Sequence, residues 1–489
     1  MEQRTSFLLL FLFPLGWALF TIGPDLVRRS MYNDGIWYAS ISRNLAEDRG
    51  TLWFPFLSET IHTRFHEHPP LGFGIQSLMF RCLGDGLATE RIYSLIILVL
   101  TIAVMVGIGR KVSEASQGRE SIALLAICLW LLNEITYRVA PSNLLETTMG
   151  LLDLCAAALL LGKTRERWWS LPAAAACIAA ALLVKGPAAA YPLALPFATW
   201  ITGLTPDRKR MLIQTSTLIL LVMGGLGSLL LIDDARESLT TYVRQQIWSS
   251  MTSQRTEYHH RASQAWILGR LLVTQLPAIG MLILIRLSRP RVRIQAKDRV
   301  WMFLLIMGAV ASLPLMISPK QADYYLYPSL PWYALAMARL VQGPWQELIS
   351  GLTDHRFLHR GVLVIGVGLV VAGAIRTSTE WGKVVERDQE VWQDVQHIRK
   401  VAGDGATVSL WMPGDSLQDQ LALSSYLIGY LQRKARIHVD TSGKDWPVHL
   451  RWHEDKRPVP DWLTPVDIPA VRYPIYRNSN ATLSRPGID

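Results

Sequence analysis

Long apolar blocks run through the first three-quarters of this chain, and they limit how it can fold more than any other feature. Met211 to Ile232 contains no charged residue, and similar blocks recur at Ile92–Gly109, Ile122–Leu132, Leu144–Gly162 and Gly361–Ile375. Charged residues make up 18% of the chain, whereas a soluble protein would have about 25%. Because a span needs roughly 20 apolar residues, the pattern predicts a polytopic membrane protein with about 11 to 13 spans.

The basic residues follow the order of these spans. Lys and Arg outnumber Asp and Glu by 49 to 39, but they gather in short loops between apolar blocks, which favours membrane orientation over nucleic-acid binding. Phe7 to Gly23 is expected to be an uncleaved first helix because no small-residue cleavage site follows it. With Arg4 on the cytoplasmic side, every second loop is short and basic. The alternate loops then face the periplasm: Asp34–Pro70, Asn133–Asn143, Lys185–Pro187, Asp233–Ser263 and Ser318–Tyr327.

The first outer loop, from about Pro24 to Pro70, is unusually long and polar for its early position. Within it, Trp37, Ile41 and Leu45 recur at helical spacing and predict a short amphipathic helix at the membrane interface. Leu71 to Leu83 follows a Pro-Pro break and is too short to span, so we expect a second interfacial helix.

The composition changes near Arg376, after which no spanning segment occurs. The pattern predicts helices at Trp381–Val401 and Gln418–Gln432, and strands at Ala406–Trp411, Arg436–Val439 and Val448–Trp452. We therefore expect a membrane domain over residues 1–376, including the outer loop and its interfacial helices at 24–90. A small periplasmic α/β domain is expected over residues 377–489.

Asp34, in the segment NDGIWYA, stands directly before the amphipathic helix. Aspartate is a favoured N-cap. A carboxylate at the lipid–water boundary could also accept a proton from an acceptor hydroxyl or amine as a general base. Both interpretations are open at this point.

A second cluster comprises His62, His66, Glu67 and His68, in a stretch that ends FHEHPPLG. Imidazole and carboxylate suit zinc, but the spacing fits no standard zinc motif, and a solvated polar loop is the alternative. The four cysteines, Cys82, Cys128, Cys155 and Cys177, have no CxxC spacing, and predict neither a disulfide framework nor a thiolate metal site.

Further candidates occur in the later outer loops. Lys185 precedes Gly-Pro within an apolar stretch, where its cation could stabilise a phosphate or simply snorkel to the interface. Asn143 and Glu146, after Arg138, could cap a helix. Tyr324 and Tyr325 belong to an interface belt or to a site. The remaining candidates could bind a phosphate or form a solvated loop: Lys320, Arg255, Tyr258, His259, His260 and Arg261.

Together these segments resemble the polytopic GT-C glycosyltransferases of the ArnT and protein O-mannosyltransferase-like group, which use polyprenyl-phosphate sugars. The resemblance covers about Phe7 to Leu340. LLVKGP around Lys185 is its most specific match, and NDGIWYA, HEHPPLG, RVAPSNLL, EYHH and SPKQADYYLYPSLP resemble other family segments. The chain departs from the family pattern at Gly35, where a second acid is usual, at His68, where the family has lysine, and at Asn143, where it has aspartate.

The resemblance implies an inverting sugar transfer at the outer face of the bacterial inner membrane. Asp34 would be the base, while Lys185, Arg255 and Lys320 would surround the donor phosphate and Tyr324 or Tyr325 would hydrogen-bond it. Glu67 would organise the site. No cofactor is required, although Glu67 with His260 is the candidate pair for a divalent metal such as zinc.

The expected partners are a polyprenyl-phosphate sugar donor, a lipid or protein acceptor (lipid A or another envelope glycan among them) and membrane lipids, with no nucleic acid, and the chain is expected to act as a monomer. Two other classes remain open. A lipid-linked saccharide transporter or flippase would need charges inside spans and inverted repeats. A glycan polymerase or ligase would also use outer loops.

Overall fold

The computed structural model describes residues 2–112, 119–249, 265–294, 296, 298–318, 321–354, 356–412, 417–444, 446–469 and 471–479. The chain divides into two compact units. The first comprises Met1–Val27, Glu67–Gly72 and Ala88–Trp381, and the second comprises Arg28–His66, Phe73–Leu87 and Gly382–Asp489. The first polar loop therefore packs mostly with the C-terminal segment in one unit, whereas the sequence had grouped it with the membrane part.

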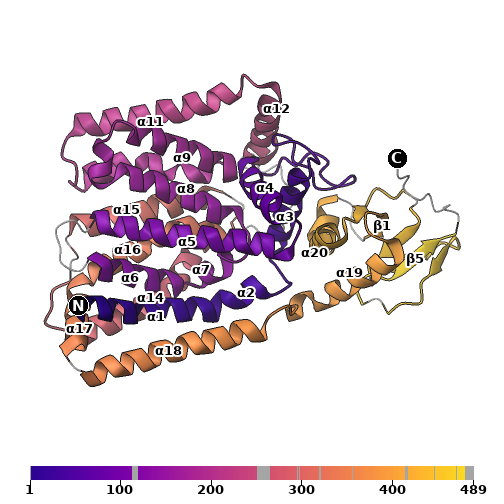
Figure 1. The fold of residues 1–489 in the computed structure, drawn as a ribbon. Coiled ribbons are helices and arrows are strands. Elements are labelled where there is room, and N and C mark those ends of the chain that lie inside the picture. Colours follow the sequence, from indigo (N-terminus) through magenta and orange to yellow (C-terminus); the bar gives the residue numbers. More distant parts are fainter. Residues whose placement is uncertain are drawn as a thin grey trace. The chain divides into compact units, whose positions relative to one another are not determined.

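The first unit is helical, as the apolar blocks predicted (Figure 1). Its longer helices are α1 (Glu2–Thr21), α5 (Leu87–Val112), α6 (Arg119–Leu131), α8 (Leu145–Leu160), α9 (Ser170–Lys185), α11 (Arg208–Leu229), α14 (Trp266–Ser288), α15 (Arg299–Ser312), α16 (Leu330–Leu340), α17 (Gln342–Asp354) and α18 (Arg356–Thr379). Its short elements are α2 (Gly23–Val27), α7 (Glu134–Val139), η1 (Gly162–Glu166), η2 (Pro187–Ala194), α10 (Leu195–Ile201), α12 (Asp233–Tyr242), η3 (Val243–Trp248), η4 (Leu313–Ile317) and η5 (Asp323–Ser329).

Five helical segments in the described part of the chain are long and apolar enough to cross a membrane. They are Leu87–Val112, Arg208–Leu229, Trp266–Ser288, Arg299–Ile317 and Phe357–Thr379. Shorter apolar helices, among them Ser170–Lys185, pack beside them. The polytopic helical class is thus confirmed, and the total of about 11 to 13 spans stays a prediction.

Small residues let α1 and α18 approach closely along their length. A Cβ added at Gly16 would lie 2.8 Å from the backbone nitrogen of Val370, and one at Gly373 would lie 2.7 Å from the carbonyl oxygen of Gly16. Such backbone proximity is typical of packing in lipid, where close van der Waals contact replaces the hydrophobic effect as the driving force. These glycines therefore hold the first and last long helices of the unit together.

The second unit contains α3 (Asn33–Ala46), most of α4 (Leu71–Leu83), η6 (Glu386–Asp388), α19 (Gln389–Ala402), α20 (Leu417–Ala435) and a mixed sheet in the order β2-β1-β3-β5-β4. The strands are β1 (Thr407–Trp411), β2 (His438–Asp440), β3 (Val448–Arg451), β4 (Leu463–Pro465) and β5 (Ile475–Asn478). β1 pairs in parallel with β2 and β3, while β5 pairs antiparallel with β3 and β4. In register, Val408 faces Val439 and Leu410 faces Leu450.

Several predicted elements of this unit need correction. The helix expected over Trp381–Val401 begins only at Gln389. The chain turns at Gly382, which adopts φ +70°, and forms the short η6 before this helix starts. β4 and β5 were not predicted. The apolar face of α3 is covered by α20 instead of lying open to lipid, since Trp37, Ile41 and Leu45 are all buried and the Trp37 indole donates to the Ser425 carbonyl at 3.0 Å.

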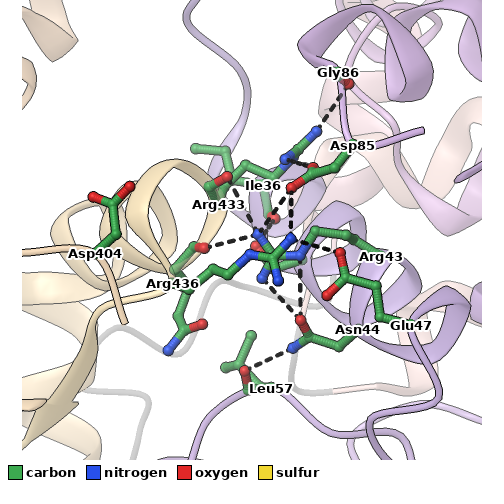
Figure 2. Close-up of polar contacts among 12 residues, drawn as sticks. Ile36, Arg43, Asn44, Glu47, Leu57, Asp85, Gly86, Asp404, Arg433 and Arg436 are labelled. Carbon is green, nitrogen blue, oxygen red and sulfur yellow. Dashed lines mark hydrogen bonds and ion pairs between the residues drawn. The ribbon is translucent and has the colours of Figure 1, made fainter. Parts of the chain in front are cut away.

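A buried arginine ties α3 to α20 (Figure 2). Arg43 is 1% exposed and donates to the carbonyl oxygen of Gln432 at 3.1 Å and to Asn44 Oδ1 at 2.8 Å. Burial lowers the pKa of Arg43 to about 10, with Asp85 acting in the opposite direction, so the side chain keeps its charge at neutral pH. Asp85 also pairs with Arg433 and Arg436, which makes this a charge network internal to the second unit.

Candidate functional site

A buried lysine in the first unit contacts side chains from three other segments. Lys185 is the last residue of α9, where Gly186 adopts φ +90° and ψ −151° and ends the helix. Its side chain is 8% exposed, and its Nζ lies 3.0 Å from Glu146 Oε1. An ammonium at a helix C-terminus is favoured by the helix dipole. The burial and the ion pair contradict the simple snorkelling interpretation of this residue.

Two further side chains contact the same ammonium from different segments. His68 Nε2 lies 3.4 Å from Lys185 Nζ, and the Tyr325 ring centroid lies 5.7 Å from it. Tyr324 stacks edge-on against Tyr325 with ring centroids 4.8 Å apart. Lys185, Glu146, His68 and Tyr325 are therefore brought together, and we call these four residues the lysine cluster.

Asn143 is not the N-cap of α8, whereas Glu146 is an acid in the first turn of that helix, as the capping interpretation expected. The N-cap of α8 is Leu144, and Glu146, 1% exposed, belongs to the first turn. Asn143 adopts φ +55°, a left-handed conformation that asparagine tolerates better than most residues. Asn143 therefore turns the chain into α8, and Glu146 is left to pair with Lys185.

Arg138 joins a second cluster, built around Asp323 of η5. Its Nη2 lies 2.6 Å from Asp323 Oδ2, and Arg270 Nη2 lies 2.8 Å from the same oxygen. Glu134 lies 3.5 Å from Arg270 and completes the group. Partial burial acts to raise the pKa of Asp323, but the hydrogen bonds and charges of both arginines outweigh it and hold the pKa below its ordinary value.

This second cluster was not predicted. Asp323 stands within the segment SPKQADYYLYPSLP, directly before Tyr324 and Tyr325, whose aromatic rings are the more visible sign of a membrane interface. Arg270 lies within an apolar stretch, which is the one signal that could have identified it. Since η5 carries both Asp323 and Tyr325, this short helix joins the two clusters on one segment.

Asp34 lies in the second unit, in the first turn of α3, where Tyr32 is the N-cap. The N-cap interpretation is therefore wrong by two positions, although an acid in the first turn still interacts favourably with the helix dipole. Burial raises the pKa of Tyr426, with the carboxylates of Asp388 and Asp34 acting in the same direction, which places Asp34 within electrostatic reach of that phenol. Convergence of Asp34 with the lysine cluster stays a prediction.

Four predicted site residues, Arg255, His259, His260 and Lys320, lie outside the described residues, as do Tyr258 and Arg261. Glu67 is exposed and belongs to the first unit. In the described part of the chain, no three His, Cys, Asp or Glu side chains gather closely enough to hold a metal. The described residues alone therefore do not complete a zinc site.

The fold and part of the sequence match known proteins. Residues 67–232 match the model of the dolichyl-phosphate-mannose-protein mannosyltransferase family. A crystal structure of ArnT from Cupriavidus metallidurans bound to undecaprenyl phosphate superposes with a TM-score of 0.62 at 15% identity, covering 96% of this chain and 98% of that one. The apo structure of the same protein gives 0.59 at 16% identity, covering 97% and 98%. No curated protein sequence matches the chain.

These findings confirm the predicted GT-C fold and the predicted enzyme class. The family match lies in the first unit and in α4, and it includes both Glu67 and Lys185. The structural match extends over almost the whole chain, including the C-terminal sheet region. The chain is accordingly a multi-pass membrane protein with the fold of a glycosyltransferase.

Proposed function

We propose that this membrane glycosyltransferase moves a sugar from a polyprenyl phosphate to an acceptor on the periplasmic face of the bacterial inner membrane, acting as a monomer. The lysine cluster is the observation that carries the proposal. A buried ammonium, held between Glu146, His68 and Tyr325, is a preorganised cation of the kind that stabilises charge developing on a leaving group. In the same fold, ArnT from Cupriavidus metallidurans was crystallised with undecaprenyl phosphate.

The proposed reaction is a single displacement with inversion. Asp34 accepts the proton of an acceptor hydroxyl or amine, and the freed electron pair forms a bond to the anomeric carbon. The bond from that carbon to the phosphate oxygen breaks on the opposite face, and its electron pair remains on the phosphate. Lys185 stabilises this new charge, and Tyr324 or Tyr325 donates a hydrogen bond to the phosphate.

The remaining roles follow the family resemblance. Arg255 and Lys320 would add cations around the donor phosphate, and Glu67 would organise the loop before α4. Short basic loops on one side of the apolar blocks support the orientation that exposes these groups to the periplasm. Lipid A, another envelope glycan and a protein are the acceptor classes to be tested.

The test is transfer by the purified protein in proteoliposomes, with a panel of undecaprenyl-phosphate sugars and with lipid A or peptides as acceptors. We expect Asp34→Asn to lower the rate by at least about 100-fold, because a positioned base contributes 10²–10⁴-fold, while undecaprenyl phosphate still binds. Asp48→Asn is the matched control, since Asp48 is an exposed acid just after α3. Full activity of Asp34→Asn would remove Asp34 from the mechanism.

A further inference from the structure

Glu146 has no part in the reaction proposed above, yet it forms an ion pair with Lys185. It is 1% exposed, Lys185 is 8% exposed, and their charged atoms lie 3.0 Å apart. A carboxylate this deeply buried normally persists only when it is paired, because desolvation penalises its charge. The pair has a net charge of zero, so the cation proposed to contact the donor phosphate is already neutralised by the protein.

This arrangement affects ligands according to their charge. A phosphate oxygen in contact with Lys185 Nζ, at about 2.8 Å for a charge-assisted hydrogen bond, lies within about 6 Å of the Glu146 carboxylate. Repulsion at that separation grows in proportion to the phosphate charge and is only partly screened inside a protein. The sugar donor is a phosphodiester with one negative charge. The product, a polyprenyl phosphate monoester, carries about 1.5 to 2 negative charges near neutral pH.

We infer that Glu146 limits the affinity of the site for the product monoester, so that the site distinguishes donor from product by charge. The inference rests on the proposed function, because it requires Lys185 to contact the phosphate. Transfer converts a singly charged ligand into a more highly charged one, which a bare buried ammonium would hold more tightly. With Glu146 present, the additional negative charge of the product increases its affinity for the site less, and the product dissociates more readily.

Lys185 is also anchored by contacts that do not involve Glu146. The Tyr242 hydroxyl donates to the Lys185 carbonyl oxygen at 3.4 Å, and Gly186 packs directly against that hydroxyl. His68 and the Tyr325 ring contact the ammonium from other segments. Replacing Glu146 by the isosteric glutamine is therefore expected to remove a charge while leaving Lys185 in its place.

The experiment measures binding of two probes to the full-length protein in detergent micelles at about pH 7.5, where the monoester is largely dianionic. The probes are undecaprenyl phosphate and its methyl phosphodiester, which share a tail and differ in charge. We expect the wild-type protein to bind them within about threefold of each other. In Glu146→Gln the affinity for the monoester, relative to that for the diester, should rise about tenfold, a change of about 1.4 kcal/mol in relative binding free energy. Glu146→Asp keeps a carboxylate but holds it farther from Lys185 and the phosphate. It should shift the ratio of the two affinities in the same direction by about twofold.

Glu134→Gln is the matched control, because Glu134 is another acid of the first unit but pairs with Arg138 and Arg270. The ratio of monoester to diester affinity in this variant should equal that of the wild type. If the role of Glu146 were purely structural, its replacement would weaken binding of both probes equally and leave the ratio of their affinities unchanged. An unchanged ratio in Glu146→Gln, or in Glu146→Asp if the glutamine variant does not fold, overturns the inference. Failure of the wild-type protein to bind either probe would instead contradict the proposed function.

Discussion

The hydroxyl of Tyr242 occupies the space that a side chain at Gly186 would need. A Cβ built at Gly186 would lie 2.1 Å from Tyr242 Oη, and Gly186 also adopts φ +90°, which L side chains rarely do. The close approach lets the phenol reach the backbone carbonyl of Lys185. The tight turn after α9 thus has a structural role next to the lysine cluster.

We expect Gly186→Ala to displace Tyr242, to strain the turn and to weaken binding of undecaprenyl phosphate by at least about tenfold, since small displacements of a positioned group carry large costs. Gly225→Ala is the control, because Gly225 lies inside α11 with open space around its Cβ position, where alanine favours the helix by about 1 kcal/mol. Equal binding by the two variants would show that the turn does not hold Lys185.

The network in the second unit gives a prediction about stability. Arg43→Met removes the buried guanidinium that donates to the carbonyl oxygens of Gln432 and Arg433, and it removes a positive charge from the Asp85 network. We expect a loss of roughly 3 kcal/mol, measured as faster hydrogen exchange in α3 and α20. Arg81→Met, which breaks an exposed pair with Asp48, should cost less than about 1 kcal/mol. Equal exchange in the two variants would contradict the role of Arg43.

Local signals in the sequence were enough to give the bounds of one helix and the end of another. The Pro-Pro break and Gly84, which adopts φ +79°, gave the bounds of α4 as observed, and Gly186-Pro187 marked the end of α9 beside Lys185. These signals act through the backbone of a few adjacent residues, so they can be read without knowledge of tertiary structure.

Long-range pairings could not be predicted in the same way. The partner of Lys185 lies in α8, and Asp323 pairs with Arg270 across 53 residues, so each contact depends on how whole helices pack. Asp153 stands alone in an apolar block of the sequence, and it is fully buried in α8 with no hydrogen-bond partner in the described part of the chain. The partners of Lys185 and Asp323 could therefore be named only once the fold was known.

The two arginines that surround Asp323 predict a pH dependence of stability. The pKa of Asp323 is lower in the folded protein than its unfolded value of about 3.9. The group therefore stabilises the fold fully above that unfolded value, and the contribution is lost as pH falls through the lower, folded pKa. We expect Asp323→Asn to lose less thermal stability than the wild type between about pH 5 and pH 3. Intrinsic-fluorescence melting would measure this.

The control for that measurement is Asp233→Asn, because Asp233 is an exposed acid whose partner is the exposed Arg236. Its melting temperature should depend on pH as that of the wild type does, since an exposed ion pair contributes little. An Asp323→Asn variant with the same pH dependence as the wild type would show that the arginines do not stabilise the ionised carboxylate in the folded state.

The buried pair of Lys185 and Glu146 predicts a strongly non-additive double substitution. Lys185→Met alone leaves a 1%-exposed carboxylate without its main counter-charge, so we expect a loss of about 3–5 kcal/mol in the free energy of unfolding. Adding Glu146→Leu removes that charge and should recover most of the loss, because apolar replacements of a buried ion pair are often neutral. Thermal unfolding of both single variants and of the double variant completes the cycle. Additive losses would mean that the two side chains do not act as a pair, whereas recovery of stability without recovery of undecaprenyl phosphate binding would separate the structural role of the pair from the phosphate contact of Lys185.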